Sequence, residues 1–195
     1  MCLVVLAIVA LAVPATSTAA AVHRRPTKPT FIIQDATLYS FNLTKSKTFL
    51  NTTLRVTISA RNPNPRAGIE YDTLGIYAAY RDQQVTNFAD LVHGYLGPKK
   101  VVTWAPALMT GDGEDVPVTR AQARAVGRDL RAGLVVMNVT VNGRMRWKVG
   151  SRRSKKYYLA AYCPAYLRAS EGKSGGVGGG VKYQLDQGCS VTLSP

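Results

Sequence analysis

The sequence has few of the residue types that metal sites and most enzymes require. It contains only two histidines, His23 and His93, and three cysteines, none of them in the close pairs that hold zinc. A G-x-S-x-G elbow for a serine hydrolase and a complete P-loop for nucleotide phosphates are also absent. We therefore expect no metal, no cofactor and no enzymatic activity.

Acidic residues are scarce as well. The chain has 11 Asp and Glu against 25 Lys and Arg, which gives a formal net charge of +14. Such an excess predicts attraction to an acidic partner, either nucleic acid, anionic lipid or an acidic polysaccharide. Apolar residues, in contrast, are plentiful: 46% of the 195 residues are hydrophobic, enough for one domain with its own core.

The first 22 residues contain no charged side chain, and up to Val13 they are densely apolar. Thirteen helical residues span only about 20 Å of the roughly 30 Å hydrocarbon core, whereas all of residues 1–22 would just span it. A cleaved signal segment fits almost equally well, because Ala19 and Ala21 supply a small-x-small cleavage pattern. We therefore divide the chain into an apolar anchor or signal segment (1–22), a basic proline-containing stem (23–30) and a folded domain (31–195).

Two features of the sequence disagree about which side of the membrane holds this domain. Arg24 and Arg25 follow the apolar segment, and by the positive-inside rule they would keep the domain in the cytosol. Export is indicated instead by three N-glycosylation acceptors, which are Asn42, Asn51 and Asn138. We favour export, with the domain outside the cell and the apolar segment in the plasma membrane; the alternative is a secreted protein.

Most of the domain alternates apolar and polar residues, as sheet proteins do. Strict alternation runs over residues 50–60 and recurs over 74–80, 135–141 and 145–149. Between the last two segments, Asn142-Gly143 predicts a two-residue hairpin turn, because both residues tolerate positive φ. Closing strands are expected over 157–163 and 181–193.

One segment has helical spacing instead. Thr119 and Gln122 form a capping-box pattern at its start, and Gly133 is a natural C-terminal stop. A single short helix cannot cover both faces of one sheet, so the pattern favours an all-β sandwich of about seven short strands.

Two cysteines, Cys163 and Cys189, lie in the closing strands. Each shares strand parity with apolar neighbours, so both side chains should face the core. Outside the cell they could form one disulfide; the alternative is two buried free thiols.

An asparagine- and proline-rich passage follows the strand over residues 50–60. Pro63 and Pro65 lack the donor that a sheet ladder needs, and the side chains of Asn62 and Asn64 can hydrogen-bond nearby backbone. We interpret this passage as a turn between two strands; the alternative is a binding loop.

The densest positive charge lies over residues 144–156. Three of its cations, Arg144, Arg146 and Lys148, share the outward face of a predicted strand. Four more follow in the next turn: Arg152, Arg153, Lys155 and Lys156. This basic patch is either a solvated strand edge or a surface that binds an acidic partner. We expect no nucleic acid there, because the chain carries export signals and no nucleic-acid-binding motif.

Several short motifs occur in order along nearly the whole chain: "RPTKP" at 25–29, "FNLT" at 41–44, "RNPN" at 61–64, "IEYD" at 69–72, "RWKVG" at 146–150, and Cys163 in a tyrosine-rich strand. In these motifs the chain resembles the plant late embryogenesis abundant subgroup 2 proteins, especially the harpin-induced-like, hydroxyproline-rich glycoproteins. The resemblance implies an immunoglobulin-like or fibronectin-like β-sandwich, an N-terminal membrane anchor with the domain outside the cell, a role in defence or stress responses, and no catalytic residues.

Two hypotheses of function follow. In the first, the protein is a non-enzymatic, plasma-membrane-anchored glycoprotein that binds wall, membrane or protein partners during defence or stress. In the second, it is a secreted module that binds carbohydrate or protects against desiccation and stress.

Overall fold

The computed structural model describes residues 26–44, 46–111, 115–168 and 181–195. The expected anchor or signal segment (1–22), the first residues of the stem and the glycine-rich run 172–180 lie outside the described residues. Within the described part, no helix has the length and apolar content needed to cross a bilayer.

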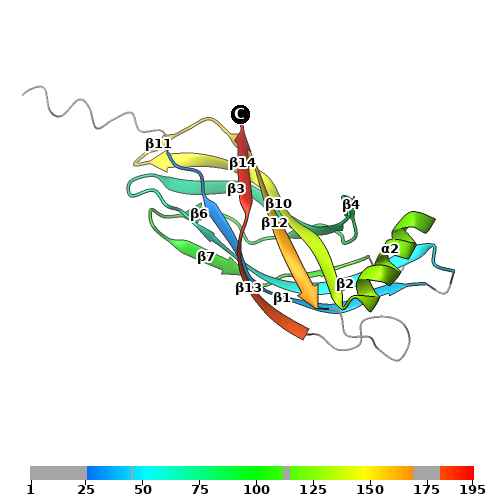
Figure 1. Cartoon of the computed structure of the whole chain (residues 1–195). Coiled ribbons are helices and arrows are strands. Elements are labelled where there is room, and N and C mark those ends of the chain that lie inside the picture. The colour runs from blue at the N-terminus through cyan, green and yellow to red at the C-terminus, as the bar shows by residue number, and fades with distance from the viewer. Residues whose placement is uncertain (1–25, 45, 112–114, 169–180) are drawn as a thin grey trace, which may run out of the picture.

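Two antiparallel sheets pack face to face and enclose one hydrophobic core (Figure 1). The first sheet contains β1 (Thr30–Leu43), β2 (Phe49–Arg61), β7 (Val101–Trp104), β8 (Ala107–Met109), β9 (Val116–Pro117) and β13 (Val181–Gly188). The second sheet contains β3 (Gly68–Tyr80), β4 (Gln83–Gln84), β5 (Ala89–Asp90), β6 (Tyr95–Leu96), β10 (Leu134–Val149), β11 (Arg152–Arg153), β12 (Tyr157–Arg168) and β14 (Ser190–Ser194). One helix, α2 (Arg120–Arg131), completes the described elements.

The strand order is simple in both sheets. It runs β13-β1-β2-β7 in the first sheet, with β8 and β9 also paired to β2. In the second sheet it runs β14-β12-β10-β3-β4, with β5 and β6 paired to β3 and β11 paired to β10. The described residues therefore confirm the predicted all-β arrangement with one helix.

The apolar residues of the alternation over residues 50–60 form the core-facing side of β2. Leu54, Val56 and Ile58 are fully buried, whereas Arg55 on the other face is exposed. Thr52, the one polar residue on the apolar face, is fully buried as well. Strand β2 thus contributes one whole face to the core because its side chains alternate with a period of two.

Helix α2 begins and ends where the sequence predicts. Thr119 is its N-cap and forms a capping box with Gln122, while Gly133 adopts a φ of 72° just past the last turn. Val126 packs into the core from this helix. The hydroxyl of Tyr80 donates to Asp129 Oδ2 at 2.6 Å, so the helix is also tied to the end of β3.

The hairpin turn predicted at Asn142-Gly143 is wrong. Strand β10 runs without interruption from Leu134 to Val149, and Asn142 pairs with Ala160 of β12 on one side and Gly75 of β3 on the other. A strand paired on both sides has no room for a turn. The apolar parity also continues across Gly143 without a shift, which is what one continuous strand requires.

Gly143 instead serves a close approach between two strands. A β-bulge interrupts the register of β3 against β10: Arg144 lies opposite Thr73 and Met145 lies opposite Tyr71, so Asp72 is the extra residue. Beside this bulge, a Cβ added at position 143 would overlap the carbonyl oxygen of Thr73. Glycine is therefore needed here for space rather than for a turn.

We expect Gly143→Ala to lower the free energy of unfolding by about 1–3 kcal/mol, because the bulged strand must move to admit the methyl group. Gly127→Ala, in α2, is the matched control: nothing lies within 4 Å of the added Cβ. That variant should be neutral or more stable by up to about 1 kcal/mol. Urea unfolding of both variants checks the prediction, and equal stabilities would contradict it.

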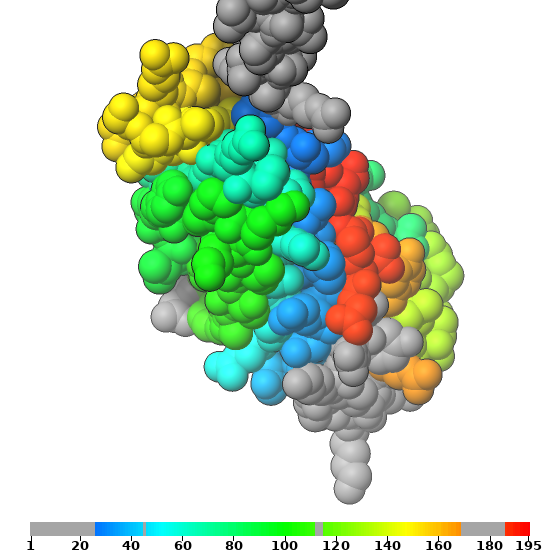
Figure 2. Space-filling view, turned by 90° about the vertical axis from the view of Figure 1, so that its left-hand side faces the viewer, coloured from blue at the N-terminus to red at the C-terminus, as the bar shows by residue number. Residues whose placement is uncertain are grey.

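The single strand predicted over residues 181–193 is also wrong, because the chain changes sheet at Cys189. Strand β13 pairs with β1 of the first sheet, and the backbone N–H of Cys189 still donates to the Phe31 carbonyl at 2.9 Å. The next residue, Ser190, pairs with Tyr162 of the second sheet. In Figure 2 the C-terminal residues (red) accordingly lie beside the N-terminal residues of β1 (blue).

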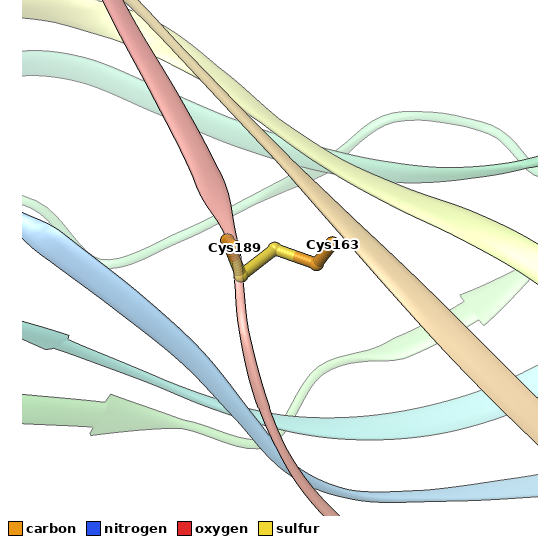
Figure 3. The surroundings of a disulfide bond; sticks show 2 residues. All are labelled: Cys163 and Cys189. Atoms are coloured by element: carbon orange, nitrogen blue, oxygen red, sulfur yellow. A yellow bond between two sulfur atoms is a disulfide. The ribbon is translucent and has the colours of Figure 1, made fainter.

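A disulfide joins the two sheets at this crossover (Figure 3). Cys163 of β12 is fully buried, and its Sγ lies 2.02 Å from that of Cys189, 26 residues later. A crosslink closing a loop of that length stabilises a fold by about 3–4 kcal/mol in the chain-entropy model. The bond therefore holds β14 to the second sheet at the point where its chain leaves the first.

Candidate functional site on the outer face of the second sheet

The asparagines of the "RNPN" motif form a buried corner rather than a ligand site. Asn62 is fully buried, and its Nδ2 donates to the carbonyl oxygens of Ala67 at 2.8 Å and Gly97 at 3.1 Å. Its Oδ1 accepts from the backbone N–H of Asn64 at 3.0 Å. Because these amides are used inside the protein, the motif fixes the turn around Pro63 and leaves few polar atoms for a ligand.

The same corner holds the stem in place. Asn64 accepts from the backbone N–H of Thr27 at 2.7 Å and donates to its carbonyl at 2.8 Å. Lys28 Nζ donates to the carbonyl of Val191 at 2.6 Å. The described chain thus begins at one end of the sandwich, the end at which β11 also lies (Figure 1).

The predicted basic patch lies at this end and is interleaved with acidic residues of β3. Asp72 pairs with Arg146 at 2.7 Å and with Lys156 at 3.4 Å. Glu70 pairs with Arg153 at 2.7 Å. Three of the seven predicted cations are therefore in ion pairs, and the patch is a mixed network with an excess of positive charge.

The bulge explains why Asp72 is part of this network. Beyond the bulge, Leu74 and Ile76 face the core, whereas before it Tyr71 and Ile69 do so. In a regular strand without the bulge, Asp72 would lie on the same face as Leu74 and point inward. The bulge turns its carboxylate to the outer face, where it receives the guanidinium of Arg146.

Both carboxyl groups are held in their charged form. Hydrogen bonds from Arg146 keep the pKa of Asp72 below its usual value, and a hydrogen bond from Arg153 does the same for the pKa of Glu70. The two ion pairs therefore stabilise the fold at pH values above the ordinary pKa of a carboxyl group. This stabilisation is lost as the pH falls through the lowered pKa values of Asp72 and Glu70.

The remaining cations of the patch are Arg144, Lys148, Arg152 and Lys155, and among the described residues none of them makes an ion pair. Three of them lie over tyrosine rings instead: Lys148 over Tyr95 at 5.3 Å, Lys155 over Tyr157 at 5.6 Å and Arg144 over Tyr158 at 5.8 Å. Each such contact holds a cation without neutralising it. The net positive charge of the patch therefore remains available to an acidic partner.

A groove of about 450 Å³ opens on the same outer face, next to the patch. Tyr158 and Tyr162 of β12 line it, together with Asn142 and Arg144 of β10 and Thr73 of β3. The two tyrosines are 58% and 49% exposed. Sequence reasoning missed this groove, although Tyr158, Tyr162 and Tyr166 share the parity opposite to the buried Cys163, which marks them as an outward-facing row.

The three predicted glycosylation acceptors lie in different surroundings. Asn138 is exposed on the outer face of the second sheet. Asn42 lies within β1, and it is directly opposite Asn51 of β2. Both are half-buried, with Asn51 Nδ2 donating to Asp115 Oδ1 at 3.2 Å. Asn138 is thus the acceptor with the most open surroundings.

We expect Asp72→Asn to lower the free energy of unfolding at pH 7 by up to about 1 kcal/mol, because a partly exposed ion pair is lost. As the pH falls from about 5 to about 2, through the ordinary pKa of an aspartate and then through the lowered pKa of Asp72, the wild type should lose stability because Asp72 takes up a proton, and the variant should lose less. Asp90→Asn removes an exposed carboxylate that makes no described ion pair and is the control. Urea unfolding across this pH range checks the prediction; parallel curves for wild type and Asp72→Asn would contradict it.

Taken together, the described residues define an all-β protein whose second sheet presents cations and aromatic rings, and they contain no group of three side chains able to hold a metal. No family model matches the chain. It is 40% identical to NDR1/HIN1-like protein 12 of Arabidopsis thaliana, over 87% of this chain and 80% of the relative. It is 38% identical to NDR1/HIN1-like protein 1 of the same plant, over 87% of this chain and 81% of the relative.

The chain therefore belongs to the NDR1/HIN1-like proteins. A third relative, NDR1/HIN1-like protein 26 of Arabidopsis thaliana, is 34% identical over 73% of this chain. These similarities confirm the resemblance to the harpin-induced-like proteins that the short motifs indicate.

Proposed function

We propose that the chain is a non-enzymatic binding protein of plant defence or stress responses and that the outer face of the second sheet is its ligand surface. The observation that carries the proposal is the gathering of unpaired cations and exposed tyrosines on that one face. The partners that fit such a surface are acidic: wall polysaccharide, anionic lipid or an acidic membrane protein. The role in defence or stress rests on the family alone.

We also propose that the sandwich is of the immunoglobulin or fibronectin type. The first sheet places β1, β2 and β7 side by side, and the second places β3, β10 and β12 side by side. This corresponds to the division into A-B-E and C-F-G strands that defines immunoglobulin-like sandwiches. In that scheme α2 belongs to the connection between the E and F strands, and β13 and β14 are additions at the C-terminal end.

The proposed location is the outer side of the plasma membrane, with residues 1–22 as a single membrane-spanning anchor. Three features support it: the uncharged apolar segment, the glycosylation acceptors and the disulfide between Cys163 and Cys189. In this arrangement the basic patch lies near the membrane, because the described chain begins at the same end of the sandwich.

Export predicts two properties of the protein isolated from plant cells. Glycosidase treatment should shift its mobility by the mass of at least two glycans, and thiol labelling of denatured, unreduced protein should leave Cys163 and Cys189 unmodified. An unchanged mobility together with two reactive late cysteines would contradict export. Carbonate extraction then separates the alternatives, because an anchored protein stays with the membrane and a secreted one does not.

Binding to demethylated pectin tests the ligand surface. Replacing Arg152 and Lys155 by serine removes two exposed cations that make no described ion pair, so binding should weaken while the melting temperature stays nearly unchanged. The matched control replaces Arg120 and Arg124, two exposed cations of α2, which removes the same charge far from the patch. Binding by the wild type should also fall steeply with salt, because exposed charges are screened within about 10 Å at 0.1 M. Equal losses in both double variants would contradict a specific surface.

A further inference from the structure

We propose that the groove between β3, β10, β12 and β14 binds a run of carboxylated sugars, that is, a segment of an acidic polysaccharide. The inference rests on the binding function proposed above and names the ligand and the side chains that hold it. In this proposal the basic patch attracts the polysaccharide, and the groove recognises it.

The tyrosines supply a platform for sugar rings. Tyr158 and Tyr162 lie on the outward face of β12, four residues and therefore roughly 13 Å apart along the strand. Between them is Ala160, whose small side chain leaves the space between the two tyrosine side chains open. A pyranose ring has a face of C–H groups that packs on an exposed aromatic ring, and the spacing exceeds the length of one ring. The platform thus suits an oligomer rather than a single sugar.

The rest of the lining supplies polar groups for the hydroxyls on the rim of a sugar. Asn142 and Ser194 line the groove, and within the described residues their side chains make no hydrogen bond. Thr73 and Thr192 add hydroxyls: Thr73 Oγ1 accepts from the backbone N–H of Arg144 at 3.2 Å, and Thr192 Oγ1 donates to the Ala160 carbonyl at 3.3 Å. Ligand sites commonly combine aromatic walls with a few such convergent polar groups.

Arg144 gives the groove its preference for acidic sugars. Its guanidinium lies over the Tyr158 ring at 5.8 Å, is exposed, and makes no ion pair among the described residues. No acidic residue lines the groove. A planar guanidinium binds a carboxylate through two parallel hydrogen bonds, so a uronic acid on the tyrosine platform would place its carboxylate where Arg144 can hold it.

Other ligand classes fit this lining less well. Nucleic acid binds through several phosphates at once, and the groove has one cation, Arg144. A lipid chain needs apolar walls, whereas the aliphatic side chains here are Leu159, which is buried, and the small Ala160. An extended peptide adds to a free strand edge, but this groove opens on the face of the sheet.

The test uses the full chain and four probes: unesterified oligogalacturonide, its fully methyl-esterified form, a neutral glucan oligosaccharide and vesicles of anionic phospholipid. Two variants change the groove, Tyr162→Ser and Arg144→Gln, both at exposed side chains. Tyr166→Ser is the matched control, since Tyr166 is 43% exposed on the same face of β12 but does not line the groove. Each protein is measured with and without glycosidase treatment, because Asn138 lies on this face as well.

We expect each groove variant to bind unesterified oligogalacturonide about tenfold more weakly than the wild type, and Tyr166→Ser to bind it normally. With the methyl-esterified probe, Arg144→Gln should have little effect, because the carboxylate is no longer charged, whereas Tyr162→Ser should still weaken binding. This difference between the two probes assigns the carboxylate contact to Arg144.

Three outcomes would overturn the inference. If the groove variants bind as the wild type does while the Arg152→Ser, Lys155→Ser double variant loses binding, the groove is not the site and the proposed function stands. If the wild type binds vesicles but no sugar probe, the ligand is a membrane surface. If it binds none of the four probes, both the groove assignment and the proposed acidic ligand are wrong.

Discussion

The bulge in β3 is the constraint on which the outer face of the second sheet depends. The bulge adds Asp72, which has no partner in β10. The side chains of β3 therefore change faces at this point, and Tyr71 and Leu74 both face the core. The reversal places the Asp72 carboxylate beside Arg146, and it places Thr73 against β10 so closely that position 143 must be glycine. One additional backbone residue therefore determines an ion pair, a glycine and one wall of the groove.

The basic patch and the groove meet at Arg144, which belongs to both. On the patch side, Glu70 and Asp72 neutralise part of the charge, and they hold Arg146 and Arg153 in fixed positions. On the groove side, no carboxylate lines the surface. Of the four cations of the patch that make no described ion pair, three lie over tyrosine rings, so most of its free positive charge is next to aromatic side chains.

Local signals were enough to predict the strands whose two faces differ in polarity and the helix with its capping box. They were not enough where two structures share one local pattern. Asn142-Gly143 has the composition of a turn, and only the approach of the bulged β3 shows that Gly143 is there for space. Residues 181–193 keep one apolar–polar alternation although they pair with strands of two different sheets. The alternation therefore does not reveal which partner a strand pairs with. The patch could be located from the sequence, but its partial neutralisation depends on Asp72, whose outward direction is set by the register of two strands far apart in the chain.

The attachment of the stem has a mechanical consequence. Thr27 and Lys28 are bonded to the corner at Asn64 and to β14, and the chain then enters β1, which is hydrogen-bonded to β2 on one side and β13 on the other. A pull on the N-terminal chain along the axis of β1 would load these two ladders in shear, so that many hydrogen bonds share the force at once. The covalent link at Cys189 lies beside Phe31, near the start of β1, and passes part of that load to the second sheet. In the proposed arrangement, with residues 1–22 in the membrane and a polysaccharide on the outer face of the second sheet, the domain would therefore carry mechanical load between the two.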